Sequence, residues 1–188
     1  MLLTHQVYKR GMATLVSADF VWAGNGIFRH GRRTEFTATV LYCPVLTPGL
    51  DKLSPSFSLL VPLVPERLVR MMLNEIEYMP SFERLFYLYW QESKWALHHP
   101  KQRASTTNCH SIETHPVPAS IEVHSHGNHR AFFSETDNLE EDGFRLSIII
   151  GRDKGQLEVA ARVCLHGSFY PIDSRSVLEN IGEYCHVI

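Results

Sequence analysis

The sequence predicts an α+β fold, a mixed β-sheet flanked by helices, with a β-rich extension at the amino terminus. Three observations lead to this prediction. β-branched and aromatic residues recur in short segments of residues 1–62, and one amphipathic helical segment follows them. The later strand-like segments are not spaced as regular βαβ units, which favours a mixed sheet over a doubly wound parallel one. We expect the extension to occupy residues 1–62 and the main domain residues 63–188.

The composition is that of a folded globular protein. Of the 188 residues, 44% are hydrophobic and 20% are charged, which argues against disorder, a collagen-like repeat and a coiled coil. The formal net charge of −2 argues against a function that depends on broad electrostatic contact with nucleic acid or with a membrane. The amino terminus lacks the apolar run of a signal peptide, and no apolar stretch is long enough to span a membrane, so we expect a cytoplasmic protein. The four cysteines form no CxxC pair, which favours reduced thiols over disulfides or a structural zinc ribbon.

The expected elements of the extension are strands. Residues 20–23 and 27–28 flank the turn-forming sequence Gly-Asn-Gly and predict a hairpin. Residues 35–42 and 57–61 predict further strands, because both are rich in β-branched and aromatic side chains.

A helix is expected over residues 65–79. Its first residue is a proline, which suits a first helical turn, and Leu68, Met72 and Ile76 then fall on one face. Pro80 ends the helix.

The main domain continues with alternating strands and loops. Residues 85–90 are apolar on both faces, as expected for a strand inside a sheet, and a second strand follows near residues 95–97. Residues 101–118 are polar and irregular, so we expect a long loop, and such loops are often functional. The elements expected after this loop are a strand at residues 120–126, a helix at 134–142 and a hairpin of strands at 144–151 and 157–165.

Two histidines in the strand at residues 120–126 indicate a metal site. Residues two apart on a strand project to the same face, so His124 and His126 present both imidazoles to one point in space. Ser134 begins the next helix, and Asp137 lies on the same helical face one turn later, where its carboxylate can supply a third ligand. Two imidazoles and one carboxylate leave a fourth position for water, which is typical of a catalytic zinc site.

The motif His-Ser-His, followed after seven residues by serine and two residues later by aspartate, resembles the JAMM motif of the JAB/MPN zinc metalloproteases. Further segments resemble the PRTRC system protein A family within it: residues 20–28, 62–68, 121–126, 132–134 and 143–145. The resemblance spans nearly the whole chain and implies the cytidine-deaminase-like fold of the JAB/MPN proteins.

This resemblance implies a deubiquitinase-like peptidase or isopeptidase that holds one zinc ion per chain and processes or removes a ubiquitin-like modifier. In the family the general base is a glutamate at the start of the strand after the first long helix, and Glu83 has that place here. Glu83 would take the proton of the attacking water, and Ser134 would donate a hydrogen bond to the oxyanion. The implied partners are a ubiquitin-like protein or its conjugates, and the E1-like and E2-like proteins of the same system.

Each part of the motif also has a simpler explanation. A His-x-His pair on a strand is often two polar residues on a solvated face. Ser134 and Asp137 form a capping-box-like helix start, a role that is compatible with metal binding. Three other glutamates compete for the role of general base: Glu122, Glu75 and Glu77.

Two further expectations concern the surroundings of the motif. Phe132 and Phe133 are expected to fill the core beneath the short helix. Four histidines border the long loop and could hold an additional metal ion: His98, His99, His110 and His115. A non-catalytic MPN scaffold and a small-molecule metallohydrolase are the alternative functions. Scaffolds of this type have usually lost one or more metal ligands, whereas this sequence keeps the full set.

Overall fold

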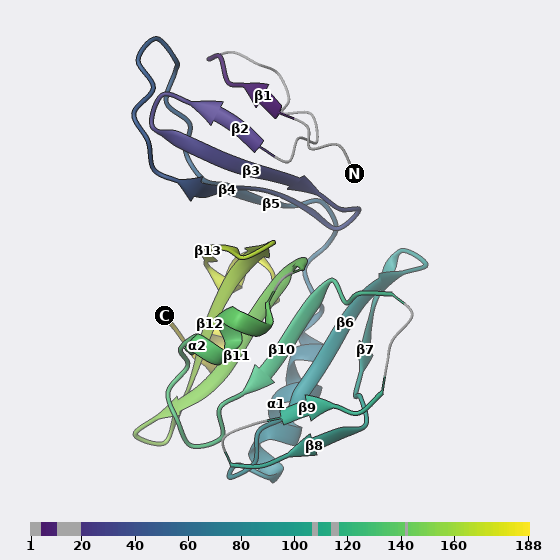
Figure 1. The fold of residues 1–188 in the computed structure, drawn as a ribbon. Coiled ribbons are helices and arrows are strands. Elements are labelled where there is room, and N and C mark those ends of the chain that lie inside the picture. Colours follow the sequence, from purple (N-terminus) through teal and green to yellow (C-terminus); the bar gives the residue numbers. More distant parts are fainter. Residues whose placement is uncertain (1–4, 11–19, 107–108, 114–116, 142) are drawn as a thin grey trace. The chain divides into compact units, whose positions relative to one another are not determined.

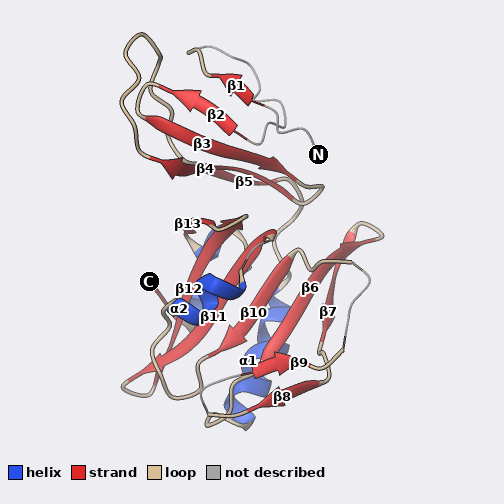
Figure 2. Ribbon diagram, in the orientation of Figure 1, coloured by secondary structure: helices blue, strands red, loops and turns tan. Residues whose placement is uncertain are grey.

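The computed structural model describes residues 5–10, 20–106, 109–113, 117–141 and 143–188 (Figure 1). The described residues contain many strands and few helices (Figure 2), which confirms the predicted α+β class. The chain divides into two compact units. The segments of the first unit are the described part of Met1–Val61, Glu141–Phe144 and Val163–Tyr170, and those of the second are Pro62–Glu140, Arg145–Arg162 and Pro171–Ile188.

A five-stranded sheet forms most of the first unit, which agrees with the predicted β-rich character of the amino-terminal region. Its strands, in chain order and in spatial order, are β1 (His5–Val7), β2 (Phe20–Ala23), β3 (Gly26–Arg32), β4 (Phe36–Cys43) and β5 (Ser56–Leu59). β1 pairs with β2 in parallel, and the other neighbours are antiparallel. The predicted β2–β3 hairpin is confirmed, because Ala23 pairs with Gly26 across a two-residue turn.

A seven-stranded mixed sheet supports the predicted site. Its spatial order is β13-β12-β11-β10-β6-β7, with β14 beside β12. The strands are β6 (Leu85–Gln91), β7 (Lys94–His98), β10 (Ile121–Ser125), β11 (Phe144–Asp153), β12 (Gln156–Leu165), β13 (Ser168–Ile172) and β14 (His186–Val187). The central strand, β10, is parallel to β11 and antiparallel to β6. The sheet is therefore mixed, as predicted.

Two helices lie on opposite faces of this sheet: Figure 1 shows α1 (Glu66–Tyr78) behind the strands and α2 (Glu135–Glu140) in front of them. α1 begins after Pro65 and ends before Pro80, close to the predicted bounds. Its buried residues are Leu68, Val69, Met72, Leu73 and Ile76. Burying each such side chain stabilises the fold by roughly 1.5–3 kcal/mol, so α1 is firmly attached to the sheet. α2, in contrast, buries none of its residues.

The remaining helical elements are short and lie near the carboxyl end. They are a 3₁₀ turn, η1 (Ser174–Ser176), and α3 (Ile181–Tyr184). In the part of the chain that the structure describes, no helix is both long and apolar enough to traverse a lipid bilayer.

The segment predicted as one long loop, residues 101–118, contains two short paired strands, so this prediction was wrong. β8 (Gln102–Ala104) pairs in antiparallel fashion with β9 (Cys109–Ser111). A strand of three residues is too short for alternation to be recognised in the sequence. The Gln102 side chain holds this hairpin to β6, because its Oε1 accepts from the Leu85 amide at 2.8 Å. Residues 107–108 and 114–116 of the segment lie outside the described residues.

Candidate metal centre

β10 and the residue just beyond it place the two histidines of the motif. His124 pairs with Leu85 on one side and with Ile149 on the other, so both neighbouring strands hold its backbone. His126 follows the end of the strand, and its amide donates to the Ile150 carbonyl at 2.9 Å. Both side chains are buried, and their Nε2 atoms lie 3.2 Å apart. The sequence therefore placed the two imidazoles together correctly.

Asp137 of α2 meets these histidines. Its Oδ1 lies 3.3 Å from His124 Nε2, and its Oδ2 lies 3.9 Å from His126 Nε2. Among the described residues, this is the only group of three or more His, Cys, Asp or Glu side chains whose ligand atoms lie within 4.8 Å of one another. Tetrahedral zinc with bonds of about 2.0–2.1 Å separates its ligand atoms by about 3.3–3.4 Å. The donor set and its spacing fit a zinc ion.

Ser134 and Asp137 form a reciprocal cap at the start of α2. The Asp137 amide donates to Ser134 Oγ at 3.1 Å, while the Ser134 amide and hydroxyl donate to Asp137 Oδ2 at 2.6 and 2.7 Å. This arrangement is the capping box that the sequence offers as a simpler explanation. It also fixes the side chain of Asp137 while the other carboxylate oxygen faces His124, so the cap leaves that oxygen placed for metal binding.

The backbone after β10 determines which ring nitrogen of His126 has a lone pair available to a metal ion. His126 Nδ1 lies 3.2 Å from the Arg130 carbonyl. A carbonyl oxygen only accepts hydrogen bonds, so Nδ1 donates and the neutral ring keeps its lone pair on Nε2. Glu158 of β12 holds this part of the chain, because it accepts from Arg130 Nη2 at 3.1 Å and from the Ala131 amide at 3.4 Å. In metal sites, a hydrogen bond to the second ring nitrogen of a histidine fixes the orientation of the ring.

Burial and mutual charge separate the pKa values of the group. Burial opposes protonation of His124, but the hydrogen bond and charge of Asp137 outweigh it, so the pKa of His124 is raised. Burial and the charge of His124 lower the pKa of His126. Burial alone would raise the pKa of Asp137, but hydrogen bonds from His124 and Ser134 hold it well below its usual range. The Asp137 carboxylate thus favours the protonated form of His124, and a metal ion competes with that proton for the same nitrogen.

Glu83 lies two residues before β6, close enough for the charges of His124 and Asp137 to act on its carboxyl. Its amide donates to the Ser105 carbonyl at 2.8 Å, which fixes its backbone beside the β8–β9 hairpin. The side chain is buried, and burial raises the pKa of its carboxyl although the charge of His124 opposes the shift. A carboxyl with a raised pKa suits proton transfer near neutral pH.

The competing glutamates have other partners or places. Glu122 lies on the strand face of the two histidines but forms an ion pair with Arg145 at 3.0 Å. Glu75 and Glu77 lie on α1, behind the sheet, and Glu75 pairs with His99 at 2.8 Å. These observations favour Glu83 among the four glutamates.

The additional metal site considered at four histidines is not found in the part of the chain that the structure describes. His98 Nε2 pairs with Glu113 Oε1 at 2.7 Å, and His99 pairs with a glutamate of α1. His110 lies on β9, and His115 lies outside the described residues.

The prediction that both phenylalanines fill the core beneath α2 was wrong for Phe132. Phe132 is 53% exposed, and its ring stands edge-on to the His126 imidazole with centroids 5.0 Å apart. A six-residue helix with no buried residue cannot cover two aromatic rings. Phe133 is partly buried and packs against the cluster of Ala131, Ile149 and Ala160.

Three residues behind the centre were missed in the sequence: Arg130, Glu158 and Arg162. Glu158 and Arg162 are both buried on β12, a strand that is otherwise largely apolar. Charged side chains are rarely buried unless they are paired. The two charged residues within this apolar strand could therefore have indicated, from the sequence alone, that the strand lies beside a polar site.

Comparison with known proteins agrees with this geometry. The family described as prokaryotic homologs of the JAB domain matches residues 64–164, more than half of the chain. The matched segment includes Glu83, both histidines, Ser134 and Asp137. No curated protein matches the chain.

Proposed function

Because the chain belongs to the family of prokaryotic homologs of the JAB domain, we propose that it is a zinc-dependent peptidase that hydrolyses an amide bond at the carboxyl terminus of a ubiquitin-like protein. One observation supports this most strongly: His124, His126 and Asp137 bring their ligand atoms within 4.8 Å of one another. These three residues would hold the zinc ion. Zinc supplies a Lewis acid that polarises a carbonyl and makes water a nucleophile near neutral pH.

Glu83 moves the proton in the proposed reaction. Its carboxylate accepts a proton from the attacking water and later delivers it to the leaving amine. The raised pKa of Glu83, which burial causes, makes its carboxylate a stronger base, so it accepts the proton of the water more readily and holds it until the amine leaves. An isopeptide of lysine has a poor amine leaving group, so this return of the proton matters as much as the attack.

Ser134 stabilises the oxyanion that forms when water attacks the carbonyl. Its hydroxyl hydrogen now points to Asp137 Oδ2 at 2.7 Å, so it must turn towards the substrate oxygen for this role. The Asp137 amide still donates to Ser134 Oγ, which keeps the oxygen in place during that rotation.

The substrate class comes from the resemblance to PRTRC system protein A. We propose a ubiquitin-like protein or its conjugates as substrate, and the E1-like and E2-like proteins of the same system as partners. The same chemistry would serve precursor processing and removal from a lysine, because both break an amide bond after the last residue of the modifier.

The test is cleavage of a ubiquitin-like protein of such a system that carries a short peptide extension at its carboxyl terminus. We expect the zinc-loaded protein to release the extension after the last residue of the modifier, as measured by mass spectrometry. A chelator abolishes the cleavage and added zinc restores it. Binding of the modifier without cleavage would contradict the proposal and favour a scaffold. Hydrolysis of small amides alone would favour a small-molecule metallohydrolase.

A further inference from the structure

α2 presents Asp137 to the two histidines, yet it has no apolar anchor of its own. None of its six residues, Glu135–Glu140, is buried, and Leu139 is 85% exposed. A helix this short is unstable without tertiary contacts. The cap between Ser134 and Asp137 joins residues of the same helix start and does not attach it to the sheet. The position of Asp137 therefore depends on other contacts to the helix.

Arg162 of β12 makes these contacts with a single guanidinium. Its Nη1 donates to Asn138 Oδ1 at 2.5 Å, and its Nη2 donates to the Asp137 carbonyl at 3.3 Å. The guanidinium carbon lies 3.9 Å from the centre of the Phe133 ring. Arg162 thus contacts Phe133, two residues before α2, and two residues within the helix, including the backbone of Asp137 itself.

The place of Arg162 in the fold makes it a rigid support. Its side chain is only 5% exposed, and its neighbours along β12, Ala161 and Val163, are also buried. A planar guanidinium that donates two hydrogen bonds and stacks on a ring has little freedom left. We propose that Arg162 is the positioning residue of the metal centre, which holds α2 so that Asp137 meets His124 and His126. This inference rests on the proposed zinc site, but Arg162 has only donor atoms and is not itself a ligand.

Electrostatics and positioning predict opposite effects when this arginine is removed. A positive charge close to a divalent cation repels it, so loss of the charge alone should strengthen zinc binding. Loss of a residue that orients a metal ligand typically weakens metal binding by about 10–100-fold. The direction of the change therefore tells which effect dominates.

The decisive variants are Arg162→Met and Arg162→Lys. Methionine has a similar length and is apolar, so it keeps the buried space filled. Lysine keeps the charge but lacks the planar fork that reaches Asn138 and the Asp137 carbonyl together. We expect zinc affinity, measured by competition with a chromogenic chelator, to fall roughly 10–100-fold in Arg162→Met and also to fall in Arg162→Lys. Full affinity in Arg162→Lys would show that the charge and not the fork is required, and would overturn the proposal.

The matched control is Arg145→Met on the neighbouring strand β11. Arg145 pairs with Glu122 at 3.0 Å, so its removal takes away a charge on the same side of the sheet without removing the contacts to Asn138 and Asp137. We expect its zinc affinity to equal or exceed that of the unaltered protein. Equal or higher affinity in Arg162→Met would overturn the proposal.

Hydrogen exchange of the zinc-free protein provides a readout that does not need the metal. The Asn138 amide donates to the Ser134 carbonyl at 3.1 Å and reports on the first turn of α2. We expect faster exchange at this amide in Arg162→Met, with unchanged exchange in β10 and α1. Unchanged exchange in α2, or a uniform rise throughout the strands, would overturn the positioning role. If the unaltered protein bound no zinc, the proposed function would fail, and this measurement would still decide the role of Arg162 in holding α2.

Discussion

His126 has its ring held from two directions. Nδ1 donates to the Arg130 carbonyl at 3.2 Å, and the Phe132 ring stands edge-on with centroids 5.0 Å apart. Nε2 is consequently the nitrogen that faces His124 and Asp137. The exposed Phe132, which we expected in the core, thus has a place as a wall of the site.

We expect His126→Ala to abolish zinc binding. The unaltered protein should contain about one zinc ion per chain, because two of the three ligands alone bind the ion far more weakly. Metal content measured by mass spectrometry checks this. His129→Ala is the matched control, since His129 is exposed in the same stretch of chain and should keep the zinc. Full zinc content in His126→Ala would remove this residue from the metal site.

We expect Glu83→Gln to keep its zinc and to lose turnover by roughly 10²-fold or more, because the amide cannot accept the proton of water. Cleavage rates and zinc content measured on the same sample separate the two effects. Glu122→Gln is the comparison variant and should keep most of the activity, since Glu122 is paired with Arg145. An unchanged rate in Glu83→Gln would remove this residue from the mechanism.

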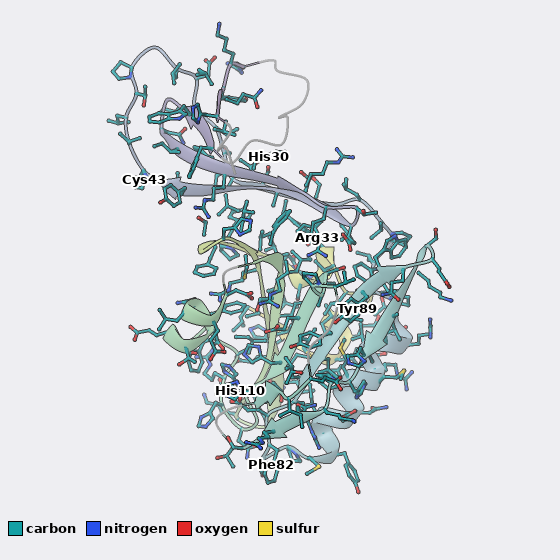
Figure 3. All side chains as sticks on the ribbon, turned by 45° about the vertical axis from the view of Figure 1, so that its right-hand side comes forward. His30, Arg33, Cys43, Phe82, Tyr89 and His110 are labelled. Carbon is teal, nitrogen blue, oxygen red and sulfur yellow. The ribbon has the colours of Figure 1, made fainter. Side chains whose placement is uncertain are left out.

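The four free cysteines differ in their surroundings. Cys43, labelled in Figure 3 on β4, is exposed, whereas Cys164 is buried. Burial raises the pKa of Cys109 and of Cys185 to about 12. We expect a thiol reagent at pH 8 to modify Cys43 rapidly in the folded protein and the other three only after denaturation, because the thiolate is the reactive form. Absorbance during reaction with an aromatic disulfide reports the number of thiols, and Cys43→Ser should remove the fast phase. A second fast thiol would contradict the burial described.

At the scale of elements, β11 and the stretch of residues 126–131 approach each other very closely. A Cβ atom at Gly151 would lie 2.2 Å from the Ala131 nitrogen and 2.6 Å from the His129 oxygen. Both are backbone atoms and cannot turn aside. Gly151 therefore allows the backbone that carries His126 and the Arg130 carbonyl to lie directly on the sheet.

We expect Gly151→Ala to move this stretch away from β11. The free energy of unfolding should fall by roughly 1–3 kcal/mol, as is typical when extra atoms are forced into a packed site, and zinc affinity should fall with it. Chemical denaturation and a zinc titration measure the two quantities. Gly143→Ala is the control, because a Cβ there meets nothing within 4 Å. Equal stability and affinity in both variants would show that the contact at Gly151 is unimportant.

At the scale of the whole molecule, the centre joins separate parts of the chain. Glu83 precedes β6, the histidines belong to β10 and its end, and Asp137 lies in α2. A ligand that binds only where these parts meet stabilises the folded state by mass action. The metal ion should therefore hold together elements that are far apart along the chain.

We expect zinc at a hundredfold excess over its Kd to stabilise the protein by about 2.7 kcal/mol. For a chain of this size, that corresponds to a rise in Tm of roughly 5–10 °C. Calorimetry with and without a chelator measures the shift, and His126→Ala should show none. An equal Tm in both conditions would contradict a metal site at this position.

Local patterns in the sequence were sufficient for much of the architecture. The β2–β3 hairpin, the helix between Pro65 and Pro80, and the projection of His124 and His126 to one point all follow from periodicity and turn chemistry. The short strands β8 and β9 did not follow, because three residues hold too little of a pattern. The exposure of Phe132 did not follow either, because it depends on how much surface a neighbouring helix covers.

The sequence thus predicted that His124, His126 and Asp137 meet and which elements bear them, since strand alternation and helical spacing act over a few residues. Only the three-dimensional fold showed which other residues hold these three side chains in place. Glu158 and Arg162 reach the site only because β12 lies next to β11 in the sheet, and Gly151 matters only because a distant backbone passes over it. These contacts join residues that are far apart along the chain, and no local pattern encodes the strand order that brings them together.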